Sequence, residues 1–212
     1  MRLYEFISEA PIPAADTDDL AQIHGPDAQT IGHGQEAQVI KNKSNPNVFK
    51  ITGLESELKN FGYMQYVLLS KKYSGINPYF PKVVSIKQTP QGLPGRISYI
   101  VQMEQLEGSG KIMKDEQIEL ANKMFYGEDL DEIVSAAKKG NSLIQYKIEK
   151  AVNAGPTIAA KFVKDKQFIQ AIKLIHLVKK NTGATIDMHD ANYMIRRGDQ
   201  GLQVVLTDPI AN

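Results

Sequence analysis

The sequence predicts an α+β protein in which an antiparallel sheet with one helix comes first and a mainly helical part follows. Three observations lead to this fold class: turn-broken β-rich text over residues 30–51, helical periodicity over 111–180, and a return to strand-like text over 193–207. The chain has 212 residues, 42% of them apolar, which is enough for one substantial domain or a compact pair of lobes. We expect an N-terminal arm or linker over 1–29, a sheet-bearing lobe over 30–106 and a reduced helical lobe over 107–212.

The composition narrows the class of protein. Lys and Arg total 25 against 24 for Asp and Glu, so no overall charge favours nucleic acid or an anionic membrane, and a phosphate site must be local. The absence of Cys removes disulfides and thiolate chemistry and fits a reducing compartment. Met1–Ala10 lacks the apolar core of a signal peptide, and no later stretch approaches the ~18 apolar residues of a membrane span. We therefore expect a cytoplasmic protein that binds neither nucleic acid nor membranes.

The N-terminal half is predicted to hold the sheet. Residues 8–29 combine three prolines with an acidic cluster, which is typical of a linker or a loosely docked arm. From Thr30 to Ile51 the text indicates an antiparallel meander with a glycine turn and a second break at Asn42–Asn47. A helix is expected from Thr52 or Ser56 to about Tyr73, and 81–86 and 97–103 are expected to form a second hairpin.

The C-terminal half is predicted to be mainly helical, with a hairpin at its end. Apolar spacing indicates helices near 115–126, 128–139, 141–152, 157–163 and 165–180, and core packing is the simplest account of this spacing. His176, within the last of these helices, is interpreted as a packed or capping residue rather than a ligand. Two strands follow, over 193–196 and 202–207, joined by a Gly-Asp-Gln-Gly turn.

Four short elements carry chemistry. The glycine-rich turn from Gly32 to Val39, sequence GHGQEAQV, lets backbone N–H groups approach phosphate oxygens, although an ordinary glycine hairpin is the alternative. Lys50 lies between Phe49 and Ile51, so in a strand it faces away from them, and by itself it could equally be a solvated lysine. The loop DMHDAN, residues 187–192, and Asp208 after an apolar strand offer oxygen ligands suited to one hard cation.

In this order the elements resemble the protein-kinase superfamily, closest to its aminoglycoside-phosphotransferase-like and small phage or bacterial kinase-like branches. The resemblance runs from about Ile31 to the C-terminus and implies a protein-kinase-like two-lobed fold that binds ATP with Mg²⁺ or Mn²⁺. It implies nucleotide-binding roles for eight residues, with Lys50 on the α- and β-phosphates and Met103 behind the adenine. These residues are Gly32, Gly34, Ala37, Val39, Lys50, Met103, Glu104 and Leu106.

The same resemblance implies catalytic roles for Asp187 and Lys50 and metal-binding roles for Asn192 and Asp208. Asp187 would orient the acceptor hydroxyl, and His189 would order the loop or lie near phosphate. The chain departs from the family in three ways. Thr185-Ile186 replaces the usual His-Arg pair, only four residues follow Asp208, and the acid that would pair with Lys50 is ambiguous between Glu55 and Glu57, with Gln65 nearer the usual spacing. We favour Glu57.

The sequence therefore predicts phosphoryl transfer from ATP to a hydroxyl of an unknown protein or small molecule. Two other readings stay open. The chain could be a nucleotide-binding pseudokinase or adaptor, because the part of a kinase that binds the acceptor is not recognisable after Asp208. It could also be a scaffold protein of phage type in which the fold marks ancestry alone.

Overall fold

The computed structural model describes residues 12–33, 37–52, 61–89, 98–127, 142–199 and 201–211. Contacts between residues divide it into two compact units. Unit 1 comprises residues 1–72, 81–105 and 212, and unit 2 comprises residues 73–80 and 106–211. The main division falls after Gln105, one residue from the boundary expected from the sequence. The segment 73–80 groups with unit 2 although it lies between two parts of unit 1 in the chain, and the sequence did not predict this.

Unit 1 contains an antiparallel sheet of five strands in the order β1-β2-β3-β5-β4. The strands are β1 (Ala28–His33), β2 (Ala37–Asn42), β3 (Asn47–Thr52), β4 (Val83–Gln88) and β5 (Tyr99–Glu104). The predicted meander is confirmed as β1-β2-β3, and the predicted second hairpin as the β4-β5 pair. In the middle strand, Lys50 lies opposite Val39 of β2 and Val101 of β5.

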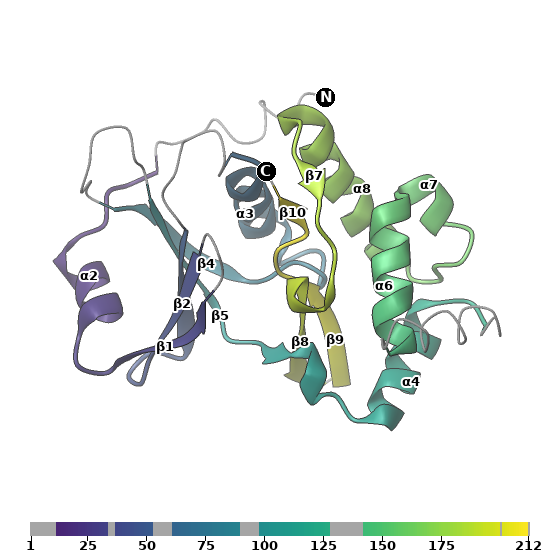
Figure 1. Ribbon diagram of the computed structural model, residues 1–212, viewed down its shortest axis with the longest axis horizontal. Coiled ribbons are helices and arrows are strands. Elements are labelled where there is room, and N and C mark those ends of the chain that lie inside the picture. The colour runs from purple at the N-terminus through teal and green to yellow at the C-terminus, as the bar shows by residue number, and fades with distance from the viewer. Residues whose placement is uncertain are drawn as a thin grey trace. The chain divides into compact units, whose positions relative to one another are not determined.

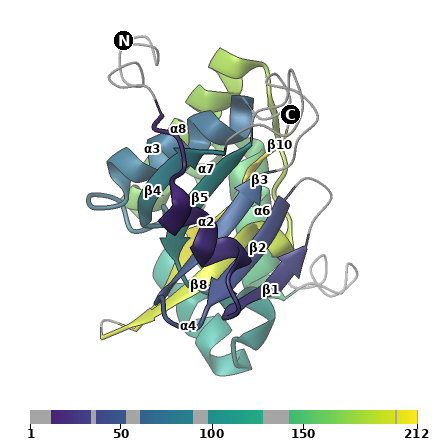
Figure 2. The ribbon, with the colours of Figure 1, turned by 90° about the vertical axis from the view of Figure 1, so that its left-hand side faces the viewer.

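Each face of this sheet is covered by a helix (Figures 1 and 2). Helix α3 (Phe61–Tyr73) packs on one face, where Tyr63, Met64 and Val67 join buried residues of β3, β4 and β5. Helix α2 (Thr17–His24) packs on the other, where Ile23 meets Ile40, Phe49 and Ile100. Because side chains alternate along a strand, Phe49 and Ile51 lie on the α2 face and Lys50 on the α3 face. The predicted orientation of Lys50 is thus confirmed.

The segment expected to be a linker or a loosely docked arm contains helix α2. Asp16 caps helix α2 in a reciprocal arrangement with Asp19, in which each carboxylate accepts the other residue's backbone N–H at 2.9–3.0 Å. Lys87 of β4 lies 3.3 Å from Asp19. The acidic cluster that suggested a solvated linker therefore caps a helix, and Ile23 and Leu20 dock that helix on the sheet.

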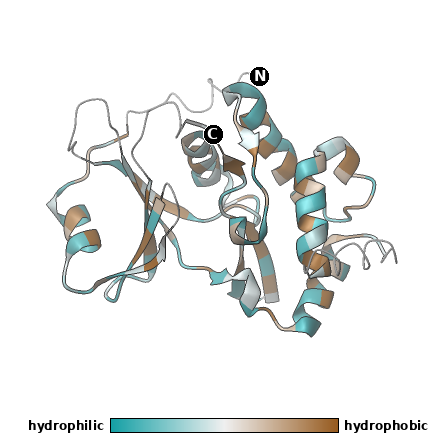
Figure 3. Ribbon diagram, in the orientation of Figure 1, coloured by the Kyte–Doolittle hydropathy of each residue, from teal (hydrophilic) through white to brown (hydrophobic). Residues whose placement is uncertain are grey.

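Unit 2 contains four described helices and a β-hairpin. The helices are α4 (Lys114–Met124), α6 (Leu143–Ala154), α7 (Pro156–Ala159) and α8 (Lys166–Thr182). Apolar and polar residues alternate along α6 in the hydropathy colouring of Figure 3, and its buried face includes Ile144, Ile148 and Val152. Helix α6 packs against α4 and α7, and α7 packs against α8. The segment 128–139, expected to be helical, lies outside the described residues.

His176 of α8 has the capping role expected from the sequence. Its Nε2 atom lies 2.7 Å from the carbonyl oxygen of Val152, at the C-terminal end of α6. Gly155 follows that end with φ of 83°, and a Cβ there would lie 3.1 Å from the Cε1 atom of the imidazole ring. The ring therefore packs over a helix terminus that requires glycine.

The hairpin comprises β8 (Tyr193–Gly198) and β9 (Gly201–Leu206), and β6 (Glu107–Gly108) pairs with β8 on its other side. A second small sheet pairs β7 (Thr185–Ile186) with β10 (Ile210–Ala211). Two 3₁₀ turns complete the unit, η1 (Ser109–Lys111) and η2 (Asp190–Asn192). None of the helices in the described ranges has the length and apolar character needed to cross a bilayer.

Candidate functional site

The DMHDAN loop is held at both ends by β-structure. Its start follows β7, whose Ile186 pairs with Ile210 of β10, and the N–H of Asp187 donates to the carbonyl of Pro209 at 3.1 Å. Its end runs through η2 into β8. The two-residue strands β7 and β10 thereby fix Asp187 next to the segment that follows Asp208.

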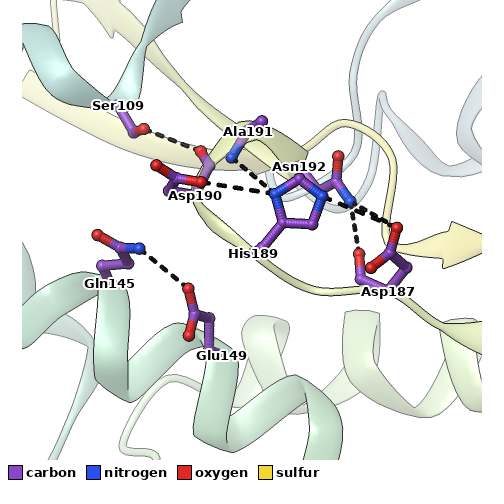
Figure 4. A network of polar contacts seen from close by, with 8 residues as sticks. All are labelled: Ser109, Gln145, Glu149, Asp187, His189, Asp190, Ala191 and Asn192. Carbon is purple, nitrogen blue, oxygen red and sulfur yellow. Dashed lines mark hydrogen bonds and ion pairs between the residues drawn. The ribbon is translucent and has the colours of Figure 1, made fainter. Parts of the chain in front are cut away.

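Asn192 is hydrogen-bonded to both of the other predicted site residues of this region, Asp187 and Asp208. Its backbone carbonyl accepts the N–H groups of Thr207 at 2.9 Å and Asp208 at 3.3 Å. Its side-chain Nδ2 donates to the carbonyl of Asp187 at 2.6 Å and lies 3.4 Å from that residue's Oδ2 (Figure 4). Asn192 is buried, with 8% of its surface exposed, whereas the Asp187 side chain is half-exposed. One buried amide residue thus fixes the positions of Asp187 and Asp208.

His189 orders the turn between Asp187 and Asn192. Its Nδ1 accepts the N–H of Ala191 at 3.3 Å and so caps η2 (Figure 4). The ring stands between two acids, with Nε2 3.8 Å from Asp187 and Nδ1 3.5 Å from Asp190. This geometry supports the loop-ordering role expected for His189.

Ser109 reaches the same loop from η1. Its hydroxyl donates to the backbone carbonyl of Asp190 at 2.9 Å (Figure 4). Tyr193 follows the loop in β8, and burial raises its pKa to about 12; the Ser109 hydrogen bond opposes this shift, and the charges of Glu149 and Asp190 add to it. Tyr193 therefore stays neutral and supports the loop as a buried side chain. Ser109 lies in the Gly-Ser-Gly segment, which the sequence marked only as a break between elements.

The β8-β9 hairpin is anchored to the segment 73–80. Arg196 donates from Nη1 to the carbonyl of Pro78 at 2.9 Å and from Nη2 to the carbonyl of Phe80 at 3.1 Å. The N–H of Leu206 donates to the carbonyl of Tyr79 at 2.9 Å. Strand β8 begins directly after Asn192, and β9 ends two residues before Asp208. These bonds therefore stabilise the two strands next to these residues.

Tyr79 extends this anchor to helix α8. Its hydroxyl donates to Asp165 at 2.8 Å, and Asp165 also caps α8 by accepting the N–H groups of Gln167 and Phe168. Burial, with the charge of Asp165, raises the pKa of Tyr79. Neither Arg196 nor Tyr79 was singled out from the sequence, because their partners are backbone or side-chain atoms at least 86 positions away.

In unit 1, Lys50 lies on the α3 face of the sheet with its Nζ 4.1 Å from the centre of the Tyr63 ring. Val39 and Val101, its neighbours across the sheet, pack with or within the apolar cluster under α3. The acids considered as partners, Glu55 and Glu57, lie outside the described residues, so the preference for Glu57 stays a prediction. Gln65 is half-buried in α3.

The other predicted nucleotide-binding residues lie in the five-stranded sheet or just after strand β5. Gly32 pairs with Val39 across β1 and β2, and Ala37 pairs with Thr52, whereas Gly34 lies outside the described residues. Met103 is buried in β5. The Glu104 N–H donates to the carbonyl of Lys82 at 3.0 Å, and Glu104 pairs with Asn47 of β3 across the sheet. Leu106 follows the end of β5 and belongs to unit 2.

Asn192 and Asp208 supply two oxygen-bearing side chains of the kind that bind a hard divalent cation. Because Nδ2 of Asn192 is directed at Asp187, its Oδ1 is the atom left for a metal, and Asp208 adds a carboxylate whose backbone is fixed to the same residue. In the described ranges, no group of three or more His, Cys, Asp or Glu is arranged to hold a metal ion.

No protein-family model matches the chain, and no curated protein matches its sequence.

Proposed function

We propose that this chain has a protein-kinase-like fold and is an ATP- and metal-dependent phosphotransferase that acts on a hydroxyl of a protein or small molecule. The observation that supports this most directly is the set of bonds around Asn192. Residues to which the family resemblance assigns acceptor orientation and metal binding, separated by up to 21 positions, are joined through one buried side chain and one carbonyl.

The roles follow from the chemistry of each group. Asp187 is half-exposed and is held by Asn192. Its carboxylate accepts a hydrogen bond from the acceptor hydroxyl and so directs the hydroxyl oxygen at the terminal phosphorus. The new P–O bond forms as the bond to the ADP oxygen breaks, and Asp187 takes the hydroxyl proton. Lys50 holds the phosphates through its charge. A divalent metal at Asn192 and Asp208 would supply charge neutralisation, because a carboxylate beside a triphosphate is otherwise repulsive.

Thermal unfolding with ATP and Mg²⁺ or Mn²⁺ tests nucleotide binding. A ligand at 100 times its dissociation constant adds about 2.7 kcal/mol to the free energy of unfolding. We expect a shift that needs both ATP and metal, is reduced in Lys50→Met, and loses its metal dependence in Asp208→Asn. Asp199→Asn is the matched control, since Asp199 is an exposed acid in the β8-β9 turn. Equal ATP affinity with and without metal in the parent protein would contradict the proposal.

Transfer of labelled phosphate separates the enzyme from the pseudokinase or adaptor. Asp187→Asn should leave ATP affinity intact. It should reduce phosphate transfer, whether to the protein's own side chains, to a partner or to water, by about 10²-fold or more. If the parent protein binds ATP and metal yet transfers nothing to any extract component, the adaptor function replaces the enzyme. If transfer persists undiminished in the variant, Asp190 on the same loop becomes the residue to test.

A further inference from the structure

The environment of Lys50 shows an aromatic contact that the sequence did not predict. Its ammonium nitrogen lies over the face of the Tyr63 ring, 4.1 Å from the centre, well inside the ~6 Å reach of a cation–π interaction. The face of an aromatic ring carries the negative part of its quadrupole and attracts an ammonium group there. Lys50 and Tyr63 both belong to unit 1, in the adjoining elements β3 and α3.

Tyr63 is itself firmly placed. It is 6% exposed and belongs to the cluster that α3 forms with the sheet, together with Val48, Val101 and Met103. Val48 precedes Lys50 by two positions on the same face, and Val101 lies directly opposite Lys50. The ring is therefore a fixed platform, and the lysine stem runs among apolar groups towards it.

A fixed platform matters for a lysine because its side chain is long and its ammonium group is a mobile, strongly hydrated point charge. Contact with a ring face favours the charged form of the amine and reduces the number of rotamers that it samples. A lysine that must meet phosphate oxygens gains from both effects, since less freedom is lost when the phosphates bind.

We propose that Tyr63 is a positioning residue that holds the Lys50 ammonium for phosphate, an inference that rests on the proposed function of Lys50. Tyr63 acts through Lys50 and touches no phosphate itself. Its effect should accordingly be confined to ligands that carry phosphates, and it should vanish when the ammonium is removed.

Four variants test this by calorimetry with ATP and Mg²⁺, with adenosine as the ligand without phosphates. Tyr63→Leu removes the ring and keeps an apolar side chain, and it should weaken ATP binding about five- to tenfold while leaving adenosine unchanged. Tyr63→Phe keeps the ring face and should bind ATP within about twofold of the parent. In the Lys50→Met background, adding Tyr63→Leu should cause no further loss.

Lys50 methylene proton shifts by NMR give a readout that needs no nucleotide. Ring current from Tyr63 should displace these resonances in the parent and in Tyr63→Phe, and the displacement should disappear in Tyr63→Leu. Equal losses for ATP and adenosine, or a Tyr63→Leu effect that persists in the Lys50→Met background, would show a structural role and overturn the inference alone. If the parent binds no ATP, the proposed function and this inference fall together, even where the NMR contact is present.

Discussion

The Asn192→Asp substitution probes the bond that joins the candidate site. The change is nearly isosteric but replaces the Nδ2 donor by a carboxylate oxygen. That oxygen would stand where Nδ2 now lies, 2.6 Å from the Asp187 carbonyl oxygen and 3.4 Å from its Oδ2. A favourable hydrogen bond thus becomes a contact between acceptors and between like charges.

The magnitude follows from these distances. The hydrogen bond that is lost is part-buried, and leaving its partner unpaired costs about 1–3 kcal/mol. Two like charges 3.4 Å apart repel by about 1 kcal/mol in water and about 5 kcal/mol at an effective dielectric constant of 20. The Asp187 side chain is 51% exposed, so screening places the repulsion towards the lower figure. We expect the free energy of unfolding to fall by about 2–5 kcal/mol, which is about 10 °C in the unfolding midpoint for a chain of this size.

Thermal unfolding monitored by circular dichroism, with and without Mg²⁺, is the measurement. Without metal, Asn192→Asp should unfold well below the parent protein, and added Mg²⁺ should restore more stability to the variant than to the parent, because a cation between two carboxylates turns repulsion into attraction. Asn122→Asp is the control, since it adds the same charge at an exposed position of α4. A midpoint for Asn192→Asp within about 2 °C of the parent would show that Nδ2 does not face Asp187.

Three further predictions concern the structure that supports the site. Arg196→Met removes two charged hydrogen bonds to Pro78 and Phe80 and should lower the free energy of unfolding in urea by about 2–4 kcal/mol, with Arg196→Lys intermediate; equal stability of all three proteins would contradict the anchor. Gly155→Ala should cost about 1–3 kcal/mol because φ is 83° and the new Cβ would lie 3.1 Å from His176, whereas Gly110→Ala, with nothing within 4 Å, should be neutral; the same urea titration measures both. The raised pKa of Tyr193, about 12 in the folded state against 10.0 for the free side chain, predicts a contribution to stability that is complete below pH 10 and lost as the pH rises through 12. Tyr193→Phe should remove that dependence from the plot of unfolding free energy against pH. If the slope between pH 10 and 12 is the same in both proteins, Tyr193 makes no such contribution.

Local pattern in the sequence was sufficient for most secondary structure. Alternation of side chains around Phe49-Lys50-Ile51 identified a strand and the face on which Lys50 lies, because the strand period of two is a local property. The helical periods of α4, α6 and α8 and the terminal hairpin were found for the same reason. The N-terminal segment, expected to be a linker or a loosely docked arm, contains a helix that the composition did not predict, since Asp16 and Asp19 indicate a helix start as readily as a loop.

The tertiary structure decided the relations between distant residues. The sequence grouped the DMHDAN loop with Asp208 as ligands for one cation, but only folding directs the Asn192 side chain at Asp187 and brings the Asp208 N–H to the Asn192 carbonyl. Arg196 and Tyr79 carry no local signal, because their partners lie at least 86 positions away, and the contact of Tyr63 with Lys50 depends on how α3 packs on the sheet. Short-range periodicity thus specified the elements, whereas the packing of those elements against one another determined which side chains meet.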